Sequence, residues 1–188
     1  LRRQRQMCIR DRANPGKMTF ASAGNGTSDH LTVELFWQQT HTKGIHVPYK
    51  GGAPAHTDLM GGQVDASFQN INSVVQYIKA GKMRALAITS PKRSAVLPEV
   101  PTLAEAGVSN VEVTSWQAIV APKGLPPAVQ KAAHDAFVEA LNSEKVRNQF
   151  TSIGFEMVAN TPEQFAAFQR QEYDRWKKVI EAGNITIE

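Results

Sequence analysis

One unit recurs three times in the first half of the chain. It consists of a short run of apolar and β-branched residues, a loop of small or polar residues, and a pattern with helical spacing. The runs are residues 18–21, 45–49 and 64–68, and a fourth run occupies residues 85–89. Alternation of this kind predicts a largely parallel sheet with helices on both faces. The chain is therefore expected to adopt an α/β fold.

The loops that end the first three runs are the best candidates for a binding site, because ligands of parallel α/β sheets bind beyond the carboxyl ends of the strands. The first loop, residues 22–28, combines two glycines with hydroxyl side chains and leads into a helical pattern. Bare backbone N–H groups and the positive end of that helix would together form an anion cradle. A simpler alternative is a helix cap alone, since Thr27 or Ser28 would cap the helix without any ligand.

The second half of the chain predicts a change of organisation. Residues 102–107 resemble a short capped helix, and residues 111–120, which contain Trp116, are predicted to form a strand. A proline- and glycine-rich corner at residues 122–127 is typical of a hinge or a lobe boundary. Beyond it we expect a helix with an apolar face over residues 129–141. The last helix would open with the Thr161 capping box and bury a stripe formed by Phe165, Phe168, Trp176, Val179 and Ile180.

The basic character of the chain is confined to its first twelve residues. The formal net charge is +4, but five of the 21 basic residues and one of the 17 acidic residues lie in residues 1–12, which leaves a neutral remainder. This balance argues against a nucleic-acid partner. The segment lacks the apolar core of a signal peptide and is interpreted as a foreign leader. It holds Cys8, the only cysteine, so the rest of the chain has no thiol for a disulfide, a zinc site or a nucleophile.

The motifs of common enzyme classes do not occur in this sequence. Gly24 and Gly26 lack the third glycine of a dinucleotide fingerprint, and the second strand ends without an acidic residue. No phosphate-binding P-loop, nucleophile elbow or close histidine spacing for a metal is present. We therefore expect no catalytic residues, metal or cofactor, and favour ligand capture without chemistry. The alternative is an α/β enzyme that acts on a small organic acid.

Several segments, in order along the chain, resemble the Bug family, whose members are the solute-binding receptors of tripartite tricarboxylate transporters. The match extends from Ala13 to about Ile185. It is carried by residues 13–17, 22–28, 46–51, 61–65, 78–87, 97–102, 105–107, 115–116, 121–124 and 161–165.

The resemblance implies a type II periplasmic-binding-protein fold with two α/β lobes that close on a small carboxylate, such as a di- or tricarboxylate. Residues 13–121 would form the second lobe, and residues 122–188 would be the C-terminal helical part of the first. The chain would then be a fragment without its signal peptide and most of its first lobe. A periplasmic, monomeric receptor that passes its ligand to membrane permease subunits is expected.

The same resemblance assigns the ligand-binding residues. The carboxylate-anchoring loop would comprise Ser22, Gly24, Asn25, Gly26, Thr27 and Ser28, with backbone N–H groups of residues 24–27 and neighbouring hydroxyls as donors. Tyr49 and Gly51 would form the adjoining wall, and Gln69 and Asn70 the third. Trp116 would either face the cleft or pack in the core.

Overall fold

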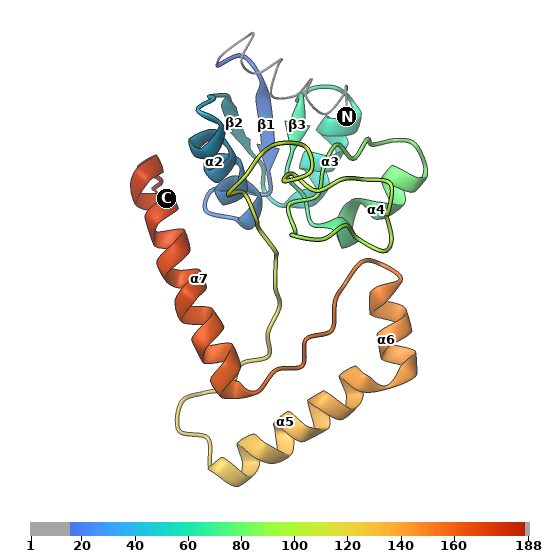
Figure 1. Cartoon of the computed structure of the whole chain (residues 1–188), viewed down its shortest axis with the longest axis vertical. Helices are drawn as coiled ribbons and strands as arrows, with labels where there is room; N and C mark the ends of the chain where they lie inside the picture. Colours follow the sequence, from blue (N-terminus) through green and yellow to red (C-terminus); the bar gives the residue numbers. More distant parts are fainter. Residues whose placement is uncertain (1–15, 187–188) are drawn as a thin grey trace.

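The computed structural model describes residues 16–186, so the leader lies outside the described residues. Its sheet has three parallel strands in the order β2-β1-β3 (Figure 1), namely β1 (Thr19–Ser22), β2 (Ile45–Pro48) and β3 (Ala66–Ser67). Each strand is followed by a helix: α2 (Ser28–Thr40), α3 (Gly52–Met60) and α4 (Ile71–Lys79). The predicted α/β fold with a parallel sheet is therefore confirmed.

The two faces of β1 are buried by different elements, because successive side chains of a strand point to opposite faces. Phe20 belongs to a core that includes Val33 and Phe36 of α2, and all three side chains are fully buried. Ala21 instead packs with Ala55 of α3 and with Val64. The central strand is thus covered on both sides, and its position is fixed by apolar contacts.

The chain then leaves the sheet and later returns to it. An exposed irregular segment, residues 114–126, leads to α5 (Pro127–Asn142) and α6 (Glu144–Thr151), which lie apart from the sheet (Figure 1). The long helix α7 (Pro162–Gly183) comes back beside α2. There Val179 is buried, and its carbonyl oxygen accepts a hydrogen bond of 3.1 Å from the Gln38 side chain.

Two strand predictions are wrong. Residues 85–89 form one isolated parallel bridge, between Ile88 and Thr102, in place of a strand. Residues 111–120 are irregular, although the Val113 N–H donates to the Thr89 carbonyl oxygen at 3.0 Å. A strand requires a continuous ladder with a neighbour, whereas among the described residues the backbone-to-backbone bonds of these segments are confined to Ile88 with Pro101 and Leu103, and to Thr89 with Val113.

The apolar faces of the last helices are less buried than expected. Every residue of α5 is at least partly exposed, and Phe137 is 46% exposed. On α7 only Val179 is buried, because this helix meets α2 near its own C-terminal end. Phe165 and Phe168 contact the Trp116 ring at centroid distances of 5.5 and 5.7 Å.

The predicted capping boxes form as hydrogen bonds. The Thr161 hydroxyl accepts from the Gln164 N–H, and the Gln164 side chain accepts from the Thr161 N–H. Thr102 and Glu105 exchange the same pair of bonds, but the segment that follows is a series of turns and not a helix. No helix among the described residues is long and apolar enough to cross a membrane.

Candidate functional site

Three loops and three helix N-termini meet at the carboxyl edge of the sheet. The loops connect Ser22 to α2, Pro48 to α3 and Ser67 to α4. All three strands are parallel, so all three helices begin at this edge. The first N–H groups of a helix have no partner within the helix and carry a partial positive charge. The edge is therefore suited to bind a negatively charged group.

The first loop is shaped by its glycines and by Thr27. Gly24 and Gly26 have φ values of 146° and 72°, which L side chains rarely adopt. The Thr27 hydroxyl donates to the Gly24 carbonyl oxygen at 2.7 Å and accepts from the His30 N–H at 3.5 Å. Thr27 is thus the cap of α2, as one of the two predicted candidates, and it also closes the loop.

The expectation of bare N–H groups throughout this loop is wrong. The Gly24 N–H donates to the Ser22 hydroxyl at 3.2 Å, and the Gly26 N–H donates to Nδ1 of His30 at 3.1 Å. The Thr27 N–H makes a longer bond of 3.4 Å to the Gly24 carbonyl oxygen. Nearby side chains can reach these donors because the loop turns back over the start of α2. Asn25 is exposed at the tip of the loop.

Hydrogen bonds join the three loops into one structure. The Tyr49 N–H donates to the Ser22 carbonyl oxygen at 3.0 Å, and the Gly51 N–H donates to that of Ala23 at 2.9 Å. The Ser67 hydroxyl donates to the Ala21 carbonyl oxygen at 2.6 Å and accepts from the Gln69 side chain at 2.8 Å. The residues predicted to form the three walls therefore lie along one continuous edge.

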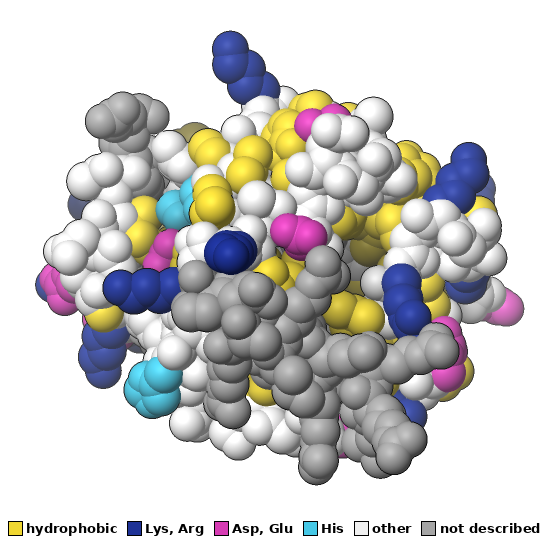
Figure 2. Space-filling view, turned by 90° about the horizontal axis from the view of Figure 1, so that it is seen from above, with side chains coloured by type: hydrophobic (Ala, Val, Ile, Leu, Met, Phe, Trp, Pro, Cys, Tyr) yellow, Lys and Arg dark blue, Asp and Glu magenta, His cyan; other side chains and the backbone are white. Residues whose placement is uncertain are grey.

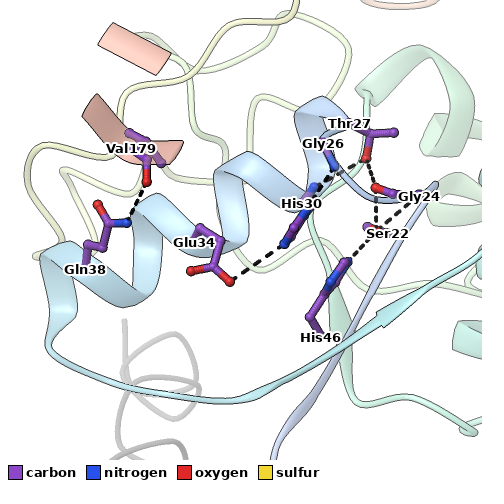
Figure 3. A network of polar contacts seen from close by, with 9 residues as sticks. All are labelled: Ser22, Gly24, Gly26, Thr27, His30, Glu34, Gln38, His46 and Val179. Carbon is purple, nitrogen blue, oxygen red and sulfur yellow. Dashed lines mark hydrogen bonds and ion pairs between the residues drawn. The ribbon is translucent and has the colours of Figure 1, made fainter. Parts of the chain in front are cut away.

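Ser22 lies beneath the loop and not on its surface. Its side chain is fully buried, and its hydroxyl oxygen is 2.6 Å from Nε2 of His46 (Figure 3). The rings of His46 and His30 are stacked, with centroids 3.8 Å apart and planes 3° apart. Ser22, which is predicted to contact the ligand, is thus buried in this structure and supports the loop through these bonds.

The other predicted wall residues differ in what they offer a ligand. The Tyr49 hydroxyl donates to the Asp58 carboxylate at 2.7 Å, and this bond raises the pKa of Tyr49. The Gln69 side-chain oxygen is 2.8 Å from Nε2 of the buried His56. Asn70 is exposed immediately before α4 and makes no side-chain capping bond. Among the predicted ligand-binding residues that have a side chain, Asn25 and Asn70 are thus the most exposed to solvent.

Burial dominates the electrostatics of the site. It raises the pKa of Asp29, while the N–H of Ala23, 3.2 Å from the Asp29 carboxylate, lowers that pKa. Burial also lowers the pKa of His30, and burial together with the neighbouring His30 lowers that of His46 to about 4. Both histidines are therefore neutral near pH 7.

A hollow of about 290 Å³ lies beside the start of α2 and extends toward α7. Ser28 lines it together with Trp116, which is 41% exposed, so the Trp116 ring both contacts α7 and faces this hollow. The remaining lining residues are Leu31, Val113, Thr114, Ser115, Glu172 and Trp176.

Sequence reasoning missed the polar residues that support the loop: Asp29, His30, His46 and His56. The histidines are scattered along the chain, and only the parallel register and the first turns of α2 and α3 bring them to this edge. No group of three or more possible metal ligands occurs within residues 16–186. On the face seen in Figure 2, lysine and arginine side chains stand apart, with acidic side chains among them.

Comparison with solved structures defines the class of protein. A structure described as a periplasmic transporter is 37% identical with a TM-score of 0.88, and covers 98% of this chain and 61% of its own. A structure described as R. palustris Rpa4515 with adipate is 31% identical, with a TM-score of 0.89. The match covers 97% of this chain and 61% of that protein. MatC from Rhodopseudomonas palustris with bound malate is 28% identical, with a TM-score of 0.81. The match covers 94% of this chain and 61% of MatC. The fold is that of the periplasmic binding proteins.

The family follows from sequence. Residues 4–185 match the tripartite tricarboxylate transporter family receptor, and the chain belongs to this family. Protein BugT of Bordetella pertussis is 39% identical over 169 residues, which are 90% of this chain and 52% of that protein. A UPF0065 protein of Pseudomonas sp. strain P51 is 40% identical over 170 residues, which are 90% of this chain and 51% of that protein. The resemblance to the Bug family is thereby confirmed, and the chain spans about half the length of these relatives.

The boundaries of the two predicted lobes stay predictions, as does the foreign origin of the leader. The family match begins at residue 4 and so includes most of residues 1–12.

Proposed function

We propose that this chain is the carboxylate-anchoring part of a receptor that captures a small organic acid for a tripartite tricarboxylate transporter. The observation that carries the proposal is the convergence of three donor-bearing loops and three helix N-termini at one sheet edge. Membership of a receptor family supports it. So do the titles of two similar structures, which describe complexes with adipate and malate.

In this proposal a ligand carboxylate binds at the start of α2. The Asn25 N–H donates to it, and the Ser28 hydroxyl exchanges its 3.4 Å bond to the Asp29 carboxylate for one to the ligand. Thr27 holds the loop that presents both donors. Gly24 and Gly26 allow close approach of the backbone. Hydrogen bonds from neutral donors to a carboxylate are charge-assisted and stronger than those between neutral groups. Tyr49, Gly51, Gln69 and Asn70 border the ligand on the other two loops.

The wider role includes a location and partners. We infer a periplasmic receptor that acts as a monomer and delivers its ligand to membrane permease subunits. The family description, a receptor of a tripartite transporter, supports the delivery, and the description of a similar structure as a periplasmic transporter supports the location. The alternative, an enzyme acting on a small organic acid, is favoured by no observation at this edge. The histidines nearest to the first loop, His46 and His30, are hydrogen-bonded to the Ser22 hydroxyl and to the Gly26 N–H.

Calorimetric titration of the chain with adipate and malate tests the anchoring loop. Thr27→Val removes the hydroxyl that caps α2 and closes the loop, and we expect it to weaken binding by about tenfold, the worth of one well-placed hydrogen bond. Thr27→Ser keeps the hydroxyl and should restore most of the affinity. Thr57→Val on α3, where the hydroxyl bonds only to the Ala53 carbonyl oxygen, serves as the matched control.

Equal affinity of Thr27→Val and the unchanged chain would contradict the anchoring role of the loop. Absence of binding to any C4 to C6 carboxylate would contradict the proposed function of this chain. A thermal unfolding curve for each variant separates loss of binding from loss of the fold.

A further inference from the structure

The Gly26 N–H is held by a side chain whose protonation state can change. It donates to Nδ1 of His30, in the first turn of α2, at 3.1 Å (Figure 3). An imidazole nitrogen accepts a hydrogen bond only when it carries no proton. Nδ1 of His30 is therefore unprotonated, and the proton of the neutral ring lies on Nε2, which faces the Glu34 carboxylate at 3.7 Å.

A second histidine holds the other glycine of the loop through Ser22. Nε2 of His46 is 2.6 Å from the Ser22 hydroxyl oxygen, and that oxygen accepts from the Gly24 N–H at 3.2 Å. The rings of His30 and His46 are stacked at 3.8 Å. Both glycine N–H groups of the anchoring loop are therefore fixed by one stacked pair of imidazoles beneath it.

We propose that His30 is a positioning residue that holds the anchoring loop in its binding conformation only while its ring is neutral. The inference rests on the proposed function, and it adds a regulation by pH. When Nδ1 takes up a proton, two N–H groups face each other and the bond to Gly26 is lost. The loop then moves, and carboxylate affinity falls.

The surroundings of His30 and His46 disfavour a positive charge on either ring. A charged His30 would stack on the His46 ring, and the His30 side chain is only 8% exposed. Burial accordingly lowers the pKa of His30. Because of this, the loss of affinity begins below the ordinary histidine pKa of about 6.5.

The acidic groups near the pair are Glu34 and Asp29, both on α2. The Glu34 carboxylate also lies against Gly183 at the end of α7, and Asp29 accepts from the Ala23 N–H. β1 carries no titratable side chain, and β2 contributes His46. On α7, Lys177 and Glu181 pair with each other at 3.9 Å and are both more than half exposed.

Two variants of His30 separate the hydrogen bond from the charge. His30→Leu removes the acceptor, and we expect about tenfold weaker binding of adipate at pH 8. Asparagine places an acceptor oxygen near the position of Nδ1 and does not titrate. We expect His30→Asn to rescue binding relative to His30→Leu and to lose the pH response of the unchanged chain. His41→Asn, at an exposed position after α2, is the control for removal of a histidine.

The experiment measures adipate affinity by calorimetry between pH 8 and pH 5. Protonation of adipate itself affects all variants equally. The difference in the pH dependence of affinity between the unchanged chain and His30→Asn therefore reports protonation of the His30 ring. Between pH 8 and pH 5, we expect the fold-decrease in adipate affinity to be about ten times larger for the unchanged chain than for His30→Asn. Parallel pH profiles of the two would overturn the inference, as would full affinity of His30→Leu at pH 8.

A second readout needs no ligand. In ¹⁵N-glycine-labelled chain, the Gly26 amide resonance should shift with the titration of His30 and should not shift in His30→Asn. If no carboxylate binds, the proposed function fails, while this resonance still tests the hold of His30 on the loop. A Gly26 resonance that is independent of pH in the unchanged chain would overturn the inference by itself.

Discussion

At the residue scale, the site depends on polar side chains that are buried where their partners are close. Ser22 is fully buried between His46 and the Gly24 backbone, and Asp29 accepts a loop N–H. Buried polar groups are stable only when they are hydrogen-bonded. These residues therefore make the conformation of the loop part of the folding free energy.

The buried His30 and the half-buried His46 should make stability depend on pH. The pKa of His46 falls from 6.5 to about 4 on folding, and that of His30 also falls. The unfolded chain therefore binds more protons below pH 6.5, and stability is lost as the pH drops from about 6.5 toward 4. The slope is at most about 1.4 kcal/mol per pH unit for each group. Asp29 and Glu34 act in the opposite sense, since burial raises their pKa values.

Urea unfolding between pH 7.5 and pH 4.5 measures this dependence. His46→Gln can keep a hydrogen bond to Ser22 without titrating, so its free energy of unfolding should fall less steeply with decreasing pH. The exposed His41, directly after α2, supplies the control His41→Asn, which should keep the slope of the unchanged chain. Equal slopes for all three would show that His46 does not contribute.

At the element scale, helix starts are set by local hydrogen bonds that the sequence already encodes. Thr161 caps α7 with a reciprocal bond to Gln164, and Pro162 occupies the first helical position. Proline fits there because the N–H that it lacks would have no partner in the helix.

Replacement of the α7 cap should destabilise the chain moderately. Thr161→Ala leaves the Gln164 N–H without its acceptor, and we expect a loss of about 1 kcal/mol in the free energy of unfolding. Thr161→Ser retains the hydroxyl and should recover most of that loss. Chemical denaturation of the three proteins provides the comparison, and equal midpoints for Thr161→Ala and the unchanged chain would contradict the role of this cap.

The sequence predicts elements well where the determining contacts are local. Both capping boxes depend on neighbours three residues apart, and both form. The three strand–loop–helix units also form, because the repeated unit supplies each strand with a parallel partner in another unit. The strand predicted at residues 111–120 has the right composition, but strand formation depends on a continuous partner far along the chain. Val113 instead bonds to the single residue Thr89, through the backbone and the hydroxyl of Thr89. The supporting histidines were missed for the same reason, because register and not spacing joins His46 to Ser22.

At the scale of the whole molecule, two long-range features define the arrangement. Residues 114–126 cross from the sheet to α5 as exposed irregular chain, and α7 returns to pack on α2. Segments with few buried contacts open at low free energy, whereas core elements do not. The crossing is therefore expected to open more readily than the sheet and α2, while the contact between α2 and α7 keeps α7 beside the sheet.

Limited digestion with a lysine-specific protease tests this arrangement. Lys123 lies in the exposed crossing, and we expect cleavage after it before cleavage at helical sites such as Lys131 or Lys177. The two fragments should elute together under native conditions, because Val179 and Gln38 keep α7 on α2. Lys123→Gln should slow the first cut. Early cleavage within α7, or separation of the fragments without denaturant, would contradict the arrangement.

The return of α7 also affects how the protein is made. Gln38 and Val179 are 141 residues apart in the sequence. A ribosome that adds about 5–20 residues per second needs on the order of ten to thirty seconds to synthesise that interval. Throughout this time α2 has been synthesised, while Val179, which completes its core and accepts the Gln38 bond, has not. The bond that closes the fold is thus among the last that translation makes possible.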